Sequence, residues 1–233
     1  TPKPEDAPRL NNEGKMLGQV DHPNVTKVYD SQMPDSGHGG YIAMEFVDGI
    51  DLKKVIEDNR TNKELMTVKE GVDIALQIAN GLGEIHRQGI IHRDLKPANI
   101  LISKNARTQD ERIKVTDFGM AKNNTDPALA NQAMGTPSFW APEVLKGETT
   151  QKSDIYSFGA TLYQMMTNQS FKDITESIPV NSLFKYPSKP LGKIPNPREI
   201  RPDLPIQLAQ LISLALDPNP RWRITLDKAI SIL

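Results

Sequence analysis

The chain has 233 residues, enough for one large domain or two small ones, and its 37% hydrophobic and 24% charged residues are typical of a folded globular protein. Its 28 basic and 29 acidic residues nearly cancel, so no overall positive field draws it toward nucleic acid or anionic lipid. It contains no cysteine, which excludes disulfides, iron–sulfur clusters, thiolate zinc sites and a cysteine nucleophile.

Two further absences limit the partners of this chain. No apolar run approaches the ~20 residues that a membrane helix needs, and the polar, proline-rich start does not have the pattern of a signal peptide. We therefore expect no membrane segment in this chain and no nucleic-acid partner.

Hydrophobic periodicity predicts a mixture of helices and short strands. The predicted strands, in chain order, are residues 25–29 and 41–47, which would form a hairpin, and then 90–91, 100–102 and 113–115. The predicted helices are residues 10–20, 51–58, 68–86, 153–167, 208–216 and 225–233. Ser153 is a candidate N-cap, and the proline-rich stretch 179–205 is predicted to be mostly loop. This order indicates an α+β fold.

Four short motifs stand out in the middle of the chain. They are His-Arg-Asp-Leu-Lys-Pro-Ala-Asn at 92–99, Asp-Phe-Gly at 117–119, Gly-Thr-Pro at 135–137 and Ala-Pro-Glu at 141–143. Leaving out the alanine, the seven residue types of the first motif should occur together by chance about once in 10^9 positions, given average residue usage.

The residue types in these motifs suit phosphoryl transfer, which needs metal ions, an acceptor for the hydroxyl proton and a cation near the moving charge. Asp94 is a carboxylate in a turn, and Lys96, two residues later, can point the same way in extended backbone. Asn99 offers an amide oxygen, which Mg²⁺ accepts as a ligand. Asp117 follows an apolar strand, and the glycine after it permits an unusual backbone conformation.

Together the motifs resemble the signature of the eukaryotic-type (Hanks-type) serine/threonine protein kinases, and the chain looks most like the bacterial members. The resemblance implies a bilobal, protein-kinase-like fold. Residues 1–44 would form a partial upper lobe with one helix and a hairpin, residues 45–49 the hinge, and residues 50–233 a mainly helical lower lobe.

The resemblance also implies the reaction, which is transfer of the γ-phosphoryl group of ATP to serine or threonine of a protein substrate. Asp94 would be the catalytic base, Lys96 would stabilise the transferred group, and Asn99 with Asp117 would hold Mg²⁺. Lys96 resembles the serine/threonine-specific branch, and Thr136 would face the catalytic residues in a substrate-docking loop. ATP and Mg²⁺ are the expected cofactors, and the cytoplasm is the expected location.

Further positions can be matched to the family. The hinge residues Glu45 and Val47 would bind adenine through their backbone, Asp51 would meet the ribose, and Leu101 would pack under the adenine ring. Met44 resembles the gatekeeper residue behind the adenine. The residues expected to stack into a spine between the lobes are Leu17, Val28, His92 and Phe118.

Structural roles are implied as well. Asp154 would anchor the catalytic loop, and Glu143 would form a buried ion pair with a late arginine. Arg221 fits the family spacing best for that pair, with Arg223 as a rival. Glu13 falls where the family has a glutamate that pairs with the ATP-binding lysine.

Each of these residues, taken singly, has a more common structural explanation. An aspartate in a turn usually forms an Asx turn or a helix cap, and the apolar positions are equally well explained as plain core. The functional interpretation depends on the occurrence of all the motifs together and in order.

One departure from the family pattern stands out. Only twelve residues precede Glu13, no Gly-rich phosphate loop is present, and Lys3 lies between prolines that a central strand would not tolerate. Three explanations remain open: a fragment lacking upstream residues, a natural truncation acting as a pseudokinase or binding scaffold, or a partner or second copy that completes the upper lobe. An exposed strand edge at residues 25–29 would invite such pairing.

Regulation by phosphorylation is also suggested. Arg93 beside Asp94 resembles kinases in which a phosphate on the activation loop pairs with an arginine. Between Gly119 and Gly135 the only hydroxyl side chain is Thr125, which is therefore the predicted phosphosite.

Overall fold

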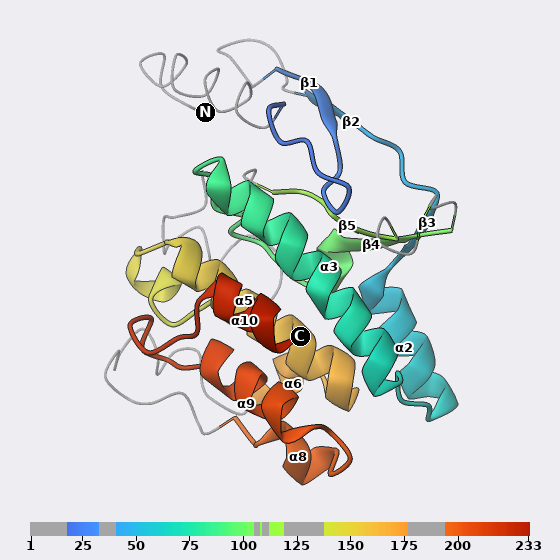
Figure 1. Cartoon of the computed structure of the whole chain (residues 1–233), viewed down its shortest axis with the longest axis vertical. Helices are drawn as coiled ribbons and strands as arrows, with labels where there is room; N and C mark the ends of the chain where they lie inside the picture. The colour runs from blue at the N-terminus through green and yellow to red at the C-terminus, as the bar shows by residue number, and fades with distance from the viewer. Residues whose placement is uncertain (1–17, 33–40, 105–107, 109–111, 119–137, 177–193) are drawn as a thin grey trace.

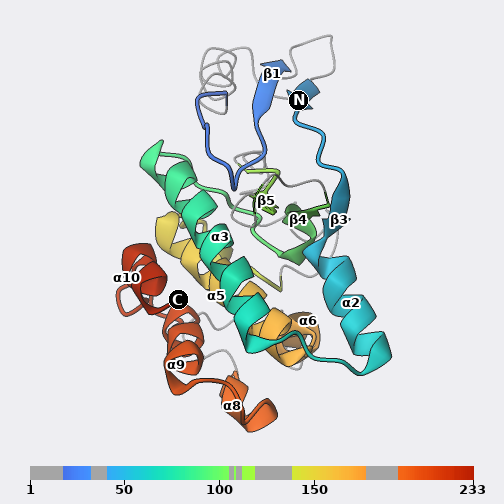
Figure 2. The ribbon, with the colours of Figure 1, turned by 45° about the vertical axis from the view of Figure 1, so that its right-hand side comes forward.

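The computed structural model describes residues 18–32, 41–104, 108, 112–118, 138–176 and 194–233 (Figure 1). A two-stranded sheet lies at one end of this part of the chain, a three-stranded sheet lies next to it, and helices form the rest (Figures 1 and 2). The predicted α+β class is confirmed. Among the described helices none is long and apolar enough to cross a membrane.

The predicted hairpin is present as strands β1 (Val28–Gln32) and β2 (Tyr41–Met44), which pair antiparallel. Its first strand begins later than predicted. Val25 is buried and forms a parallel bridge to Val115, and the Thr26 N–H donates to the Val115 carbonyl at 2.9 Å. The prediction of an exposed edge at residues 25–29 is therefore wrong for its first half, because that half packs onto the second sheet.

The second sheet contains β3 (Gly49–Asp51), β4 (Ile100–Ser103) and β5 (Ile113–Val115), all antiparallel with β4 in the middle. Its register puts Asp51 opposite Leu101 and Leu101 opposite Lys114. Residues 90–91 were also expected to be a strand, and this prediction is wrong. They lie between the end of α3 and the loop that follows, where Ile90 is buried.

The two helices that follow residues 45–49 are close to the predicted ranges. Helix α2 (Leu52–Asn62) extends one turn beyond the prediction, and the carboxylate of Asp51 caps it by accepting the Lys54 N–H at 2.7 Å. Helix α3 (Val68–Arg87) begins after Thr67, whose side chain accepts the Glu70 N–H.

Helix α5 (Gln151–Thr167) is the centre of the lower part, packed against α3 and α9 and buried on nearly every side. It begins two residues before the prediction. Thr150, not Ser153, is the N-cap, and the two side chains form a reciprocal capping box. The remaining described helices are α6 (Phe171–Glu176), α8 (Pro197–Ile200), α9 (Ile206–Ala215) and α10 (Leu226–Ile232). Much of the stretch 179–205, predicted to be loop, lies outside the described residues, and its described end contains α8.

Two glycines of α3 provide a test of this packing. A Cβ atom at Gly81 would lie 2.4 Å from the backbone oxygen of Asn24, whereas a Cβ at Gly83 would lie 3.5 Å from Cδ2 of Leu226, an ordinary contact. We expect Gly81→Ala to lower the free energy of unfolding by about 1–3 kcal/mol through overpacking. Gly83→Ala should raise it by up to about 1 kcal/mol, because alanine favours helix.

Urea denaturation of the two variants measures this difference directly. Both changes add one methyl group to the same helix, so both gain the same helix propensity. Any difference between their free energies of unfolding therefore comes from the contact with Asn24. Equal stabilities would contradict the close approach of α3 to the turn at residues 22–24.

Candidate active site

The loop of residues 92–99 joins the end of α3 to β4 and carries three of the four predicted catalytic side chains. Leu95 in this loop is fully buried, whereas about a third of the Asp94 and Lys96 side chains is exposed, at 36% and 37%. Alternation in extended backbone therefore places both charged side chains toward solvent. The loop ends in a 3₁₀ turn (Pro97–Asn99), where the Asn99 N–H donates to the Lys96 carbonyl at 2.9 Å.

Two polar side chains meet at one oxygen atom of Asp94. Its Oδ2 accepts hydrogen bonds from Lys96 Nζ at 2.7 Å and from Asn99 Nδ2 at 3.0 Å. Asn99 Nδ2 also donates to the Asp94 backbone carbonyl at 2.8 Å. The carboxylate is thus fixed in orientation, reachable from solvent and next to a cation, which suits a group that orients an acceptor hydroxyl near a phosphate.

Asp117 follows β5 and lies close to this loop along the backbone, since the Thr116 N–H donates to the Asn99 carbonyl at 3.0 Å. Its φ of 60° is in the left-handed region, which is uncommon for a residue other than glycine. Arg93, next to Asp94, has a φ of 71°. Such conformations cluster at functional sites, where surrounding contacts hold the strain.

The donor set of Asn99 and Asp117 fits a magnesium ion. Both hydrogen bonds to Asp94 use the amide nitrogen of Asn99, so its amide oxygen is the atom that can meet a cation. Within the described part of the chain no group of three or more His, Cys, Asp or Glu side chains gathers into a metal site. Mg²⁺ is usually held by one or two protein oxygens together with substrate phosphates and water.

Asp154, at the start of α5, binds the backbone of the loop of residues 92–99. Its buried carboxylate accepts the His92 N–H at 2.8 Å, the Arg93 N–H at 2.9 Å and a hydrogen bond from His86 Nε2 at 2.7 Å. Burial lowers the pKa of His92, so its ring is neutral at neutral pH and Nδ1 can accept the Asp94 N–H at 3.3 Å. The backbone around Asp94 is therefore tied to α5 on one side and to His92 on the other.

The residues predicted to bind the nucleotide lie along the second sheet and the segment that leads into it. Asp51 and Leu101 are direct partners on β3 and β4, and Val47 is half-buried between β2 and β3. Glu45 is held by its neighbours: its carboxylate accepts Lys114 Nζ at 3.0 Å and its N–H donates to the Lys27 carbonyl at 2.8 Å.

Several other predicted positions can be located. Met44 contacts Thr116, whose hydroxyl lies 3.8 Å from the Met44 sulfur. Of the four residues expected to form the spine, Val28, His92 and Phe118 are buried. The predicted residues that lie outside the described part of the chain are Glu13, Leu17, Thr125 and Thr136.

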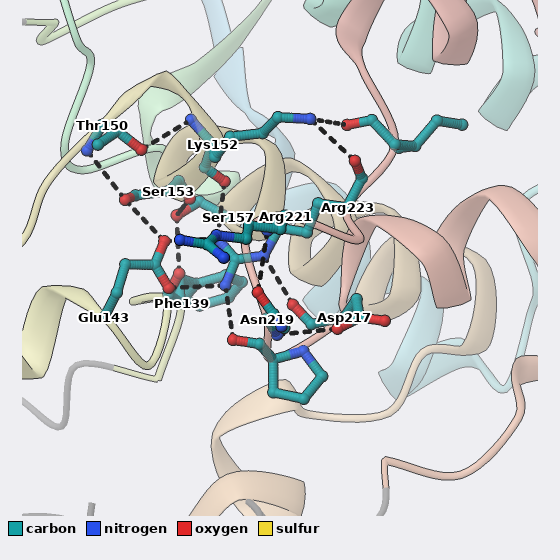
Figure 3. A network of polar contacts seen from close by, with 12 residues as sticks. Phe139, Glu143, Thr150, Lys152, Ser153, Ser157, Asp217, Asn219, Arg221 and Arg223 are labelled. Carbon is teal, nitrogen blue, oxygen red and sulfur yellow. Dashed lines mark hydrogen bonds and ion pairs between the residues drawn. The ribbon is translucent and has the colours of Figure 1, made fainter.

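The buried partner of Glu143 is Arg223, so the preference for Arg221 is wrong (Figure 3). Arg223 Nη2 donates to Glu143 Oε2 at 2.6 Å, and Nη1 reaches both Glu143 Oε1 and the Lys152 carbonyl. Ser153 adds a hydroxyl bond to Glu143 at 2.9 Å. The Arg221 side chain is exposed instead, and its backbone N–H donates to Asn219.

Comparison with family models decides the classification. The protein kinase domain model matches residues 2–232, almost the whole chain. The chain belongs to the protein kinase family. The motifs at 92–99, 117–119 and 141–143 are thus those of a kinase domain, and the described fold agrees with it.

Bacterial serine/threonine-protein kinases are among the curated relatives of this kinase domain. A probable serine/threonine-protein kinase of Clostridium acetobutylicum is 33% identical over 92% of this chain and 31% of the relative. The serine/threonine-protein kinase PknA of Mycobacterium tuberculosis is 32% identical over 94% of this chain and 48% of the relative. The chain therefore spans about a third to a half of the length of these relatives.

Solved structures agree with the family assignment. The crystal structure of the Mycobacterium tuberculosis PknI kinase domain matches with a TM-score of 0.71 and 25% identity. The match covers 99% of this chain and 79% of that chain.

Two residues of this kinase domain have contacts that the sequence analysis did not anticipate. His86 contributes a side-chain bond to Asp154, and Lys114 pairs with Glu45. For Lys114 the signal was present: a lysine in the middle of a short buried strand, next to the predicted adenine-binding Leu101, needs a partner.

Proposed function

We propose that this chain carries the catalytic body of a protein serine/threonine kinase, which transfers the γ-phosphoryl group of ATP to a serine or threonine hydroxyl of a protein substrate. The observation that supports this most directly is the meeting of Lys96 and Asn99 on the Oδ2 atom of Asp94. An oriented carboxylate with a cation beside it is what the reaction needs at its centre.

In this proposal the four polar residues have separate tasks. Asp94 accepts a hydrogen bond from the substrate hydroxyl and takes its proton as the hydroxyl oxygen bonds to the γ-phosphorus. As this bond forms, the bond between the γ-phosphorus and the leaving oxygen of ADP breaks. Lys96 neutralises negative charge on the transferred phosphoryl group. Asn99 and Asp117 would hold Mg²⁺, which supplies charge neutralisation for the triphosphate when it is bound.

The nucleotide would lie along the edge formed by residues 45–48 and the second sheet. We propose that Glu45 and Val47 present their backbone to adenine, that Asp51 meets the ribose, and that Leu101 packs under the ring. The bond from Glu45 N–H to Lys27 leaves the Glu45 carbonyl as its group for adenine. Because ATP is the expected phosphoryl donor, we also place this reaction in the cytoplasm.

The division into a partial upper lobe (1–44), a hinge (45–49) and a lower lobe (50–233) remains part of this proposal. Among the described residues the upper sheet has only the strands β1 and β2. We propose that further strands complete it, supplied by other residues of the same protein, by a partner or by a second copy. Strand edges are favourable places for such addition.

Asp94→Asn is expected to lower the rate of phosphoryl transfer by 100-fold or more while leaving the fold intact, because asparagine cannot take the proton. The measurement is transfer of labelled phosphate from Mg-ATP to a mixture of serine- and threonine-containing proteins, followed by identification of the labelled residues. Asp173→Asn, an exposed carboxylate on α6, is the matched control and should retain the wild-type rate.

The same assay separates this function from its alternative. A pseudokinase or scaffold would bind its partner protein and transfer no phosphate, and Asp94→Asn would leave that binding unchanged. Undetectable transfer by the wild-type chain, together with undetectable transfer by a longer natural form, would reject the kinase proposal.

A further inference from the structure

A cavity of about 420 Å³ lies beside the C-terminal turns of α3, away from the residues assigned to ATP and substrate. Helices α3, α5 and α10 form its walls together with His22, which precedes the turn that contacts α3. Its volume is in the range of small-molecule sites. The proposed transfer reaction uses none of its lining residues.

One wall of the cavity carries nitrogen donors. His22 Nδ1 accepts the Asn24 N–H at 3.1 Å, and burial lowers the pKa of His22, so the neutral ring carries its proton on Nε2 and can donate it. Arg87 pairs with Glu84 through Nη1 alone, which leaves the rest of its guanidinium for a ligand. Lys152 donates to the carbonyls of Arg223 and Ile224, and an ammonium group has a third proton.

The rest of the lining is mostly apolar. Ile155, Leu226 and Ile230 contribute hydrocarbon side chains, and Gly83 leaves a notch between α3 and α10. Asp227 is the only acid among the lining residues. Glu84 already balances the charge of Arg87, so the preference of the cavity comes from its donors. The remaining guanidinium N–H groups, the third Lys152 proton and His22 Nε2 outnumber the one lining carboxylate, which favours a ligand with an anionic acceptor group and a short hydrocarbon body.

The cavity is connected to the catalytic loop by a short chain of contacts. His86 lies on the cavity wall with 9% of its side chain exposed, and its Nε2 bonds to Asp154 Oδ2 at 2.7 Å. The same oxygen accepts the backbone N–H of His92 at 2.8 Å, two residues before Asp94. Gln151 also holds His86, by a bond from Nε2 to the His86 carbonyl at 2.9 Å.

We propose that this cavity binds a small organic carboxylate and that its occupancy is transmitted to the catalytic loop through His86 and Asp154. A ligand that contacts the His86 ring restricts the side chain that shares the Asp154 carboxylate with the loop backbone. Binding of the carboxylate does not depend on the proposed kinase function, whereas an effect of the carboxylate on the rate of phosphoryl transfer rests on that function.

Hexanoate is the first probe, with 1-hexanol and hexylammonium as neutral and cationic controls of equal length. The chain has four histidines, two of which line the cavity, so imidazole C–H signals in NMR spectra report binding. We expect hexanoate to shift the His22 and His86 signals in a saturable way, and the two control probes to bind at least tenfold more weakly. Equal binding of all three probes, or no binding of hexanoate, would overturn the assignment.

Variants locate the site. Gly83→Leu should fill the notch and abolish hexanoate binding, whereas Gly83→Ala, which makes only an ordinary contact with Leu226, should retain it. Arg87→Gln should weaken binding about tenfold by removing a charged donor, and Arg60→Gln, an exposed arginine on α2, should not change it. Wild-type affinity in Gly83→Leu would place the hexanoate elsewhere and overturn the proposal.

Amide hydrogen exchange tests the transmission without any activity assay. Saturating hexanoate should slow exchange of the His92 and Arg93 amides in the wild type and in His86→Gln, which keeps a donor for Asp154. In His86→Leu, which has no donor for Asp154, saturating hexanoate should leave the exchange of these two amides unchanged. If hexanoate binds the wild type without slowing exchange, the proposed transmission through His86 and Asp154 is overturned. If the wild type transfers phosphate at a normal rate but does not bind hexanoate, the kinase proposal stands and the proposed carboxylate site is rejected.

Discussion

Replacing Arg223 by methionine is expected to lower the free energy of unfolding by about 3–5 kcal/mol, because the Glu143 carboxylate then stays buried without its cation. The Arg223 side chain is 0% exposed and the Glu143 side chain 7%, and the two form a bidentate ion pair. Arg223 also lies over the ring of Tyr156, with its guanidinium carbon 5.1 Å from the centroid. The pair joins the segment after 138 to the residues just before α10, so its loss should affect the packing of the helices around α5.

Arg221→Met is the matched control, two residues away. Its side chain is exposed, and its described hydrogen bond is made by the backbone N–H, which survives the substitution. We expect a change within about 0.5 kcal/mol, as is usual for surface positions. Urea denaturation of both variants gives the comparison, and equal losses would contradict the pairing of Glu143 with Arg223.

A double variant separates the cost of the orphaned charge from the value of the pair. In Glu143→Leu/Arg223→Met neither charge remains buried, so part of the stability lost in Arg223→Met should return. The Ser153 hydroxyl and the Lys152 carbonyl would still lose the bonds that they make with Glu143 and Arg223, so we expect the recovery to be incomplete. A double variant less stable than Arg223→Met would contradict this account.

The parts of the fold that local sequence determines were predicted well. The α3 range differs from the prediction by one residue, because a long amphipathic period has a strong signal. The positions of Asp94, Lys96 and Asn99 follow from their spacing in one short loop. Alternation about the buried Leu95 accounts for the common side of Asp94 and Lys96, whereas the 3₁₀ turn places Asn99. The predicted start of α5 was two residues too late. Thr150 and Ser153 are both good helix caps, and only the backbone conformation shows which one is used.

Contacts between distant segments could not be predicted in this way. His86 and Asp154 are 68 residues apart, and Glu45 and Lys114 are 69 apart. The choice between Arg221 and Arg223 depends on which side chain points inward from an irregular turn, and both residues fit the spacing within two positions. Burial decides it: Arg223 reaches Glu143 in the interior, while Arg221 remains at the surface.

Asp154→Asn is expected to lower kcat for phosphoryl transfer by about 100-fold, because small misplacements of catalytic groups have effects of this size. The change is isosteric, yet it cannot keep all three hydrogen bonds. Asp154 Oδ2 accepts from His86 and His92, and Oδ1 accepts from Arg93. In either orientation the new amide NH₂ faces at least one N–H donor, which is left unsatisfied in a buried place at a cost of about 1–3 kcal/mol.

Because the backbone of Arg93 is strained, we expect the lost hydrogen bond to disturb mainly the loop of residues 92–99. Its φ of 71° is held by the bond to Asp154, so without that bond the loop can relax and carry Asp94 out of position. We therefore expect kcat to fall while the dissociation constant for ATP stays within about threefold, measured at a temperature where the variant is fully folded. Faster exchange of the Arg93 amide should accompany the loss, and Asp173→Asn should show neither effect. A proportional loss of ATP binding would indicate general unfolding of the lobe, and would contradict a role for Asp154 in positioning the catalytic loop.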